Sequence, residues 1–126
     1  MTIDEAIFQA DELNPNTVER ARKIEWLSSL DRLIFVELIK THEGAENTPA
    51  SFDGYDQDTA PDTVLLASGP YEDFYRHNLE MHIHLVNQEY DKYNNSAALF
   101  GEIFGQYRRA YHREHKPLTH GIYHHF

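Results

Sequence analysis

Histidine is the residue with the most chemical potential in this 126-residue sequence, which contains nine of them. Imidazole binds metals and exchanges protons near neutral pH. Two histidines, His112 and His115, could share one face of a helix, but a third metal ligand would have to come from the residues that follow. The zincin motif and the Glu-x-x-His motif of di-iron bundles are both absent. Five histidines lie in the last fifteen residues: His112, His115, His120, His124 and His125.

The other histidines fit ordinary helical roles. Glu80 lies three residues after His77 and four before His84, which is the spacing of side-chain pairs on a helix. His82 falls on an apolar stripe, where a hydrogen-bonded core histidine is expected. We therefore predict structural or interaction roles for the histidines and assign no metal ligands. A zinc titration by calorimetry, repeated on His112→Ala, would identify the alternative, a His-dependent metal-binding enzyme.

Other catalytic signatures are missing. The sequence has no cysteine, no Gly-rich phosphate loop and no Gly-x-Ser-x-Gly motif. We accordingly predict a protein that is not an enzyme and needs no cofactor. No apolar run approaches ~18 residues and no signal-peptide core follows Met1, so we expect a soluble, unexported protein without membrane contact.

Charge is distributed unevenly along the chain. The formal net charge is −10. Residues 1–73 hold 16 acids and 5 bases, a balance of −11, whereas residues 74–126 hold 5 acids and 6 bases, a balance of +1. An acidic body disfavours wrapping of nucleic acid, because phosphate neutralisation requires surplus Lys and Arg. The candidate acidic surface, between 42 and 69, comprises Glu43, Glu46, Asp53, Asp56, Asp58 and Asp62.

Helical spacing dominates the first forty residues. Thr2 followed by Glu5 predicts a capping box, and the apolar residues after it lie on one helical face until Asn14-Pro15. We expect Thr17 to cap a second helix. Residues 33–39 are almost all apolar and could be a strand by periodicity, but length and the missing turn signals favour helix. The second helix carries two apolar stripes: Ile24, Leu27, Ile34 and Leu38, and Trp26, Leu30 and Leu33.

Residues 42–69 interrupt the helical pattern with glycines, prolines and acids. This segment is predicted to be a long central loop, or a small β-hairpin in which Ser51–Tyr55 pairs with Val64–Ala67.

Two more helices are expected after this segment. Gly69-Pro70 predicts the start of the third helix, with proline at the first position. Asn94-Asn95-Ser96 predicts a tight turn before the fourth helix, which would end at Lys116-Pro117. The predicted fold is all-α, a compact bundle of about four helices in a single domain, residues 1–116, with an extended C-terminal arm, residues 117–126.

The end of the chain combines basic and apolar side chains, the usual composition of interface residues. A fully solvated tail would carry fewer apolar residues. We therefore predict that this region binds a protein partner. The candidates are Arg108, Arg109, Arg113, Lys116, Ile122, Tyr123 and Phe126.

Taken in order, four short motifs resemble one protein family. They are Phe52-x-Gly54-Tyr55, Asp62-x-x-Leu65-Leu66, Pro70-Tyr71-x-x-x-Tyr75 and Glu89-Tyr90-x-x-Tyr93-Asn94-Asn95-Ser96. Asn14-Pro15 before Ile24-x-Trp26-Leu27, and His115-x-Pro117 near the end, are similar as well. The set resembles the small head–tail connector proteins of tailed bacteriophages, also called adaptor or head-completion proteins, over nearly the whole chain.

The resemblance implies a structural phage neck protein. Such a protein forms a ring under the portal protein, dodecameric to match it, extends the DNA channel after packaging and provides the docking surface for the next neck or tail component. Its partners would be the portal protein, neighbouring copies of itself and a downstream completion protein. It would reside in the virion neck, and in the host cytoplasm during assembly. Packaged DNA would pass without specific binding, with the acidic segment lining or rimming the channel and the C-terminal arm contacting the portal. A further alternative is an acidic binding module that mimics DNA.

Overall fold

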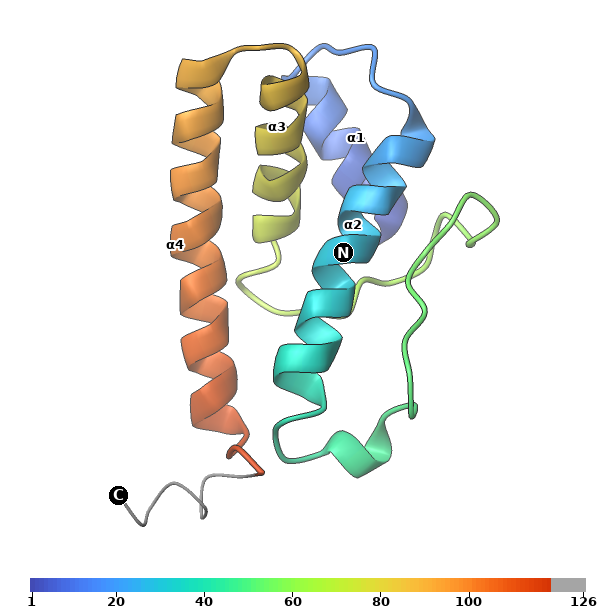
Figure 1. Cartoon of the computed structure of the whole chain (residues 1–126), viewed down its shortest axis with the longest axis vertical. Coiled ribbons are helices and arrows are strands. Elements are labelled where there is room, and N and C mark those ends of the chain that lie inside the picture. The colour runs from blue at the N-terminus through green and yellow to red at the C-terminus, as the bar shows by residue number, and fades with distance from the viewer. Residues whose placement is uncertain (119–126) are drawn as a thin grey trace.

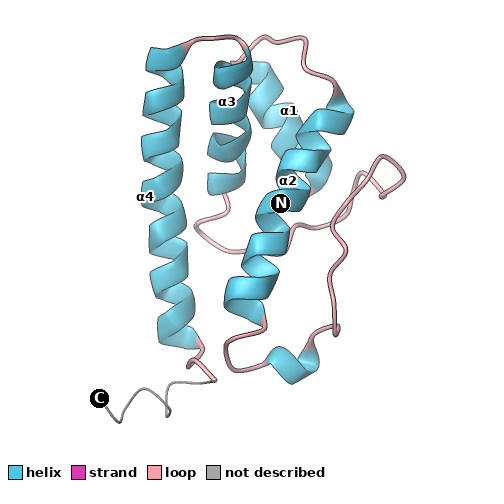
Figure 2. Ribbon diagram, in the orientation of Figure 1, coloured by secondary structure: helices cyan, strands magenta, loops and turns pink. Residues whose placement is uncertain are grey.

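In the computed structural model, which describes residues 1–118, the chain is a bundle of four α-helices (Figure 1). The third helix, α3, contacts all three others, and α4 lies alongside it (Figure 1). Figure 2 shows no strand in the described residues, where extended pairing is limited to two isolated bridges. The predicted all-α class is therefore confirmed. The helices are α1 (Ile3–Leu13), α2 (Arg20–Ile34), α3 (Phe74–Val86) and α4 (Tyr90–Glu114), with a π-helical turn η1 (Phe35–Ile39) after α2 and a 3₁₀ turn η2 (Ala45–Asn47).

The first helix follows its sequence signals closely. The Thr2 side chain accepts a hydrogen bond from the Glu5 backbone, and the Glu5 carboxylate accepts one from the Thr2 backbone, which confirms the capping box. Its apolar face, Ile3, Ala6, Ile7 and Ala10, is buried. Burial of an isoleucine of this kind stabilises the fold by about 1.5–3 kcal/mol.

The second helix begins later than predicted, and a π-helical turn follows its last residue. It starts at Arg20, and Thr17 does not cap it; the N-cap residue is Glu19, without a side-chain hydrogen bond. Residues 33–39 are helical rather than extended, but the last five form the π-helical turn η1. The predicted stripe Ile24, Leu27, Ile34 and Leu38 is buried, while Leu33 on the second stripe is exposed.

The segment between η1 and α3 is a loop, not a hairpin. The predicted partners Ser51–Tyr55 and Val64–Ala67 do not pair. Val64 instead forms an isolated bridge with Thr2, and the Leu65 N–H donates to the Met1 carbonyl oxygen at 2.9 Å. The start of α1 thus provides the backbone partners that the hairpin would have supplied.

The two predicted boundaries of the later helices are wrong. Residues 70–73 form turns, and α3 starts at Phe74. Asn94, Asn95 and Ser96 lie inside α4, whose first residue is Tyr90. The real connection is a Schellman turn at Gln88, which has φ 58°: the Gln88 N–H donates to the Leu85 carbonyl oxygen and the Glu89 N–H to that of His84. Such a turn usually contains glycine, so glutamine there gives no sequence signal.

Aromatic rings fill the space between α3 and α4. Phe74 contacts Phe104 and Tyr107, with ring centroids 5.1 and 5.3 Å apart. Phe104 and Tyr107 of α4 are therefore part of the core. Within residues 1–118, no helix combines the length and hydrophobicity needed to span a membrane.

Candidate partner-binding surfaces

The central loop displays the predicted acidic surface. All six carboxylate residues named above are exposed. The loop runs along the side of α2 that faces away from α4 (Figure 1). Two of the carboxylates already have backbone partners: Glu43 accepts from the Lys116 N–H at 2.7 Å, and Asp56 accepts from the Asp58 N–H at 2.8 Å. The carboxylates thus remain in solvent while the loop backbone is held in place.

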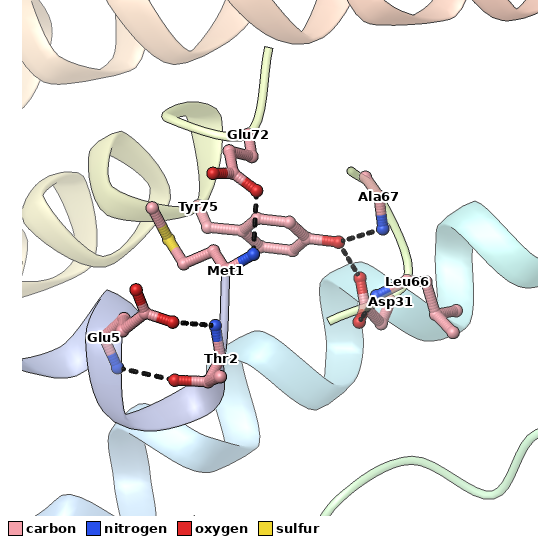
Figure 3. A network of polar contacts seen from close by, with 8 residues as sticks. All are labelled: Met1, Thr2, Glu5, Asp31, Leu66, Ala67, Glu72 and Tyr75. Carbon is pink, nitrogen blue, oxygen red and sulfur yellow. Dashed lines mark hydrogen bonds and ion pairs between the residues drawn. The ribbon is translucent and has the colours of Figure 1, made fainter. Parts of the chain in front are cut away.

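A buried carboxylate fastens this loop to the bundle. Asp31 on α2 is fully buried and accepts three hydrogen bonds: from the Tyr55 hydroxyl at 2.5 Å, the Tyr75 hydroxyl at 2.5 Å and the Leu66 N–H at 2.9 Å. The Tyr75 hydroxyl also accepts from the Ala67 N–H at 2.9 Å (Figure 3). Asp31 therefore joins α2 and α3 to two points of the loop, Tyr55 and Leu66, which lie on either side of Asp56, Asp58 and Asp62.

Burial determines the protonation behaviour of this group. Burial raises the pKa of the Asp31 carboxyl, while the hydrogen bonds from the two tyrosines and from Leu66 act in the opposite direction. Burial and the nearby Asp31 carboxylate also raise the pKa values of Tyr55 and Tyr75, so both phenols stay protonated as donors. The sequence analysis did not identify this site. The available signal was an acid that falls on the apolar stripe between Leu27 and Ile34.

The loop has a second attachment to α2 around Gly54. The Ser28 hydroxyl oxygen accepts from the Tyr55 N–H at 2.9 Å, and the Arg32 guanidinium donates to the Asp53 carbonyl oxygen at 2.6 Å. Gly54 has φ 89° and lies directly against these two side chains. Only glycine fits both the backbone angle and the space.

The predicted basic surface at the end of α4 separates into two parts. Arg108 forms an ion pair with Glu37 at 3.4 Å and lies over the Phe104 ring. Arg109 and Arg113 are exposed, and their spacing of four residues places them on one face of α4. Lys116, just after the helix, is exposed as well. The remaining candidates, Ile122, Tyr123 and Phe126, lie outside the described residues.

The base of the predicted arm is attached to the bundle by a short backbone ladder, which we call the clasp (residues 41–43 with residues 116–118). The Glu43 N–H donates to the Lys116 carbonyl oxygen at 2.9 Å, and the Leu118 N–H donates to that of Thr41 at 2.8 Å. His42 and Pro117 form the isolated bridge between them. The clasp fixes residues 116–118 at the end of the bundle opposite the α3–α4 turn (Figure 1).

Two histidines lie beside the clasp. Buried His42 contacts His112 on α4 through Nε2 and Nδ1, 2.8 Å apart, and its own Nδ1 is 2.7 Å from the Leu38 carbonyl oxygen. Burial lowers the pKa of His42. Its hydrogen bond with Leu38 acts in the opposite direction, and the neighbouring His112 and His115 lower the pKa further.

The remaining histidines have separate partners. His77 pairs with Glu80 at 3.1 Å, as predicted, whereas His84 pairs with Glu89 at 3.2 Å and not with Glu80. His82 stacks on Trp26, with ring centroids 4.6 Å apart. His112 and His115 do not act together: His115 stacks on Tyr111. Among residues 1–118, no three His, Asp or Glu side chains are grouped so that they could hold a metal ion.

Fold and surfaces together define a small helical bundle with an acidic loop and with exposed basic residues near the clasp. Comparison with known proteins adds no further identification: no family model matches the sequence, and neither curated proteins nor solved structures give a significant match.

Proposed function

We propose that this chain is a structural head–tail connector of a tailed bacteriophage, which forms a ring under the portal protein and extends the DNA channel. The clasp is the single observation that carries this proposal. A C-terminal segment without a binding role gains nothing from attachment to the bundle. A segment that binds a partner loses less conformational entropy on binding when its first residues are already fixed.

The basic residues near the clasp support a role in portal binding. Arg109, Arg113 and Lys116 are exposed close to the point where the arm leaves the bundle. Arginine is enriched in protein interfaces, where its planar guanidinium can form two parallel hydrogen bonds with one carboxylate. In this proposal these residues contact the portal together with the apolar part of the arm.

The acidic loop supports a position beside packaged DNA. Its carboxylates are exposed, and residues 43–62 contain no Lys or Arg to neutralise them. A surface of this charge repels phosphates, which would let DNA pass without adhering. The Asp31 hydrogen bonds keep Tyr55 and Leu66 against α2, and with them the stretch that carries Asp56, Asp58 and Asp62, whereas Glu43 lies in the clasp.

Exposed apolar side chains support contacts between neighbouring copies. Phe8, Val36 and Leu13 are 66%, 63% and 60% exposed. Side chains of this size are commonly covered when subunits associate. A ring needs two different surfaces per subunit, which meet head to tail.

The test is binding to the portal protein that this proposal expects to be encoded beside this chain, followed by negative-stain electron microscopy. We expect rings on the portal for the full-length chain. A chain that ends at Leu118 keeps the clasp, and we expect it to fold but to lose portal binding. Arg109→Glu with Arg113→Glu should weaken binding, while Arg22→Glu, at an exposed position on α2, provides a control for added charge elsewhere.

Three results would oppose the proposal. Undiminished portal binding by the chain ending at Leu118 would refute the role of the arm. Failure of the full-length chain to bind portal would refute the connector function. A complex with a basic DNA-binding protein, without rings, would favour the DNA mimic.

A further inference from the structure

The protons shared by His42 and His112 can be assigned from their partners. The Leu38 carbonyl oxygen can only accept a hydrogen bond. The Thr41 hydroxyl, 2.9 Å from the same nitrogen, donates its own proton to the Glu37 carbonyl oxygen, so Nδ1 of His42 carries a proton. A neutral His42 then has a lone pair at Nε2. His112 Nδ1, 2.8 Å away, must be the donor to it.

We propose that the His42–His112 pair is a two-proton switch that holds the clasp closed at neutral pH and opens it in mild acid. This inference does not depend on the connector function, because it concerns only contacts within one chain. Its consequence is that residues 116–118 are fixed to residues 41–43 in one protonation state and released in another.

The first proton leaves the clasp intact. His112 is exposed and can take a proton from solvent at Nε2 while its Nδ1–H still donates to His42. A hydrogen bond from a charged donor is stronger than one between neutral groups. The singly protonated pair therefore holds His42 against α4 at least as firmly as the neutral pair does.

The second proton breaks the contact. On His42 it can only go to Nε2, where it would face the Nδ1–H of His112. Two N–H groups and two positive charges would then oppose each other across a hydrogen-bond distance, so the rings must separate. Separation moves His42, which lies between Thr41 and Glu43, whose backbones hold Leu118 and Lys116.

Other charged groups near the pair have partners of their own. Tyr111 on α4 contacts the His42 ring edge-on, with centroids 5.2 Å apart, and His115 adds positive charge when protonated. The Glu43 carboxylate accepts from the Lys116 N–H. In the middle of η1, Glu37 pairs with Arg108. Lys40 donates to the Thr48 hydroxyl. On α4, Arg113 and Glu114 are exposed.

Hydrogen exchange of the full chain measures the switch directly. The amides of Glu43 and Leu118 report the clasp, and the amide of Leu66, bound to Asp31, reports the core. Between about pH 7.5 and pH 5, we expect protection factors at Glu43 and Leu118 to fall by up to about tenfold per pH unit below the His42 transition. Leu66 should keep its protection.

His112→Asn is the matched variant, because an amide can either donate to neutral His42 or accept from charged His42. Clasp protection in this variant should stay constant over the same range. His115→Gln removes a nearby charge but keeps the pair, so opening should persist and shift to higher pH. Nitrogen NMR of the wild type should show His42 protonated at Nδ1 near neutral pH, which tests the assignment even if a variant fails to fold.

The proposal is overturned by any of three results: wild-type clasp protection that does not change with pH, equal loss of protection in His112→Asn, or a neutral His42 protonated at Nε2. Loss of protection at Leu66 in step with Glu43 would equally overturn it, because the whole bundle would then be unfolding.

Discussion

The Asp31 carboxylate and the Tyr75 hydroxyl are joined by a 2.5 Å hydrogen bond in the core, although 44 residues separate them in the chain. The same carboxylate accepts from Tyr55, and the same hydroxyl accepts from Ala67. This arrangement secures a long loop that lacks a strand or hairpin of its own in the described residues. The position of the acidic surface thus depends on contacts inside the bundle.

Removing one tyrosine hydroxyl should destabilise the fold. We expect Tyr75→Phe to lower the free energy of unfolding by about 2–4 kcal/mol, because it removes a hydrogen bond to a buried acid and leaves the Ala67 N–H without its partner. Tyr55→Phe removes one hydrogen bond only and should cost about 1.5–3 kcal/mol. Urea denaturation measures both. Equal stability of Tyr75→Phe and wild type would contradict a structural role for this contact.

Asp31 should give stability a specific dependence on pH. Its pKa is raised in the folded state, so the folded protein keeps this proton to a higher pH than the unfolded chain does. The stabilising contribution of Asp31 should therefore be greatest below about pH 3.9 and decrease as the pH rises through the folded-state pKa. The measurement is urea denaturation of wild type and Asp31→Asn at a series of pH values, from below about pH 3.9 up to neutral pH. The stability of wild type relative to the variant should fall with rising pH, and a rise would show the opposite sign of shift.

Gly54 should be much less tolerant of alanine than Gly44. Both have positive φ, but a Cβ at Gly54 would overlap the Ser28 hydroxyl oxygen, whereas nothing lies within 4 Å of one at Gly44. We expect Gly44→Ala to cost about 1–2 kcal/mol from the backbone angle alone. Gly54→Ala should cost at least about 1 kcal/mol more. Thermal denaturation of the two variants makes the comparison, and equal losses would mean that the loop moves away from α2 at little cost.

Trp26 should report the titration of His82 by fluorescence. The chain has one tryptophan, and its ring stacks on His82. Burial lowers the pKa of His82, so we expect a fluorescence transition with a midpoint below about pH 6.5 as the charged imidazole alters its emission. His82→Phe keeps a ring at the stack and should abolish the transition. An unchanged transition in this variant would assign it to another group.

Local sequence signals predicted the helices better than their boundaries. The Thr2 capping box and the apolar face of α1 are contiguous patterns, and the structure confirms them. Gly69-Pro70 misled because turn-forming residues also occur in turns before a helix. Asn94 and Asn95 misled because polar residues also occur on exposed helical faces, where both of them lie. The turn at Gln88 escaped prediction because glutamine has no particular preference for its left-handed conformation.

By itself, the sequence determined the all-α class, the acidic central segment and the concentration of basic residues near the end. These depend on composition and on spacing within one or two helical turns, which no packing can alter. The tertiary structure alone decided that Asp31 would meet Tyr55 and Tyr75, that His42 would meet His112, and that residues 41–43 would hold 116–118. The physical reason is that such contacts form only when distant segments pack together, and a buried polar group then takes whichever donor or acceptor the packing brings to it.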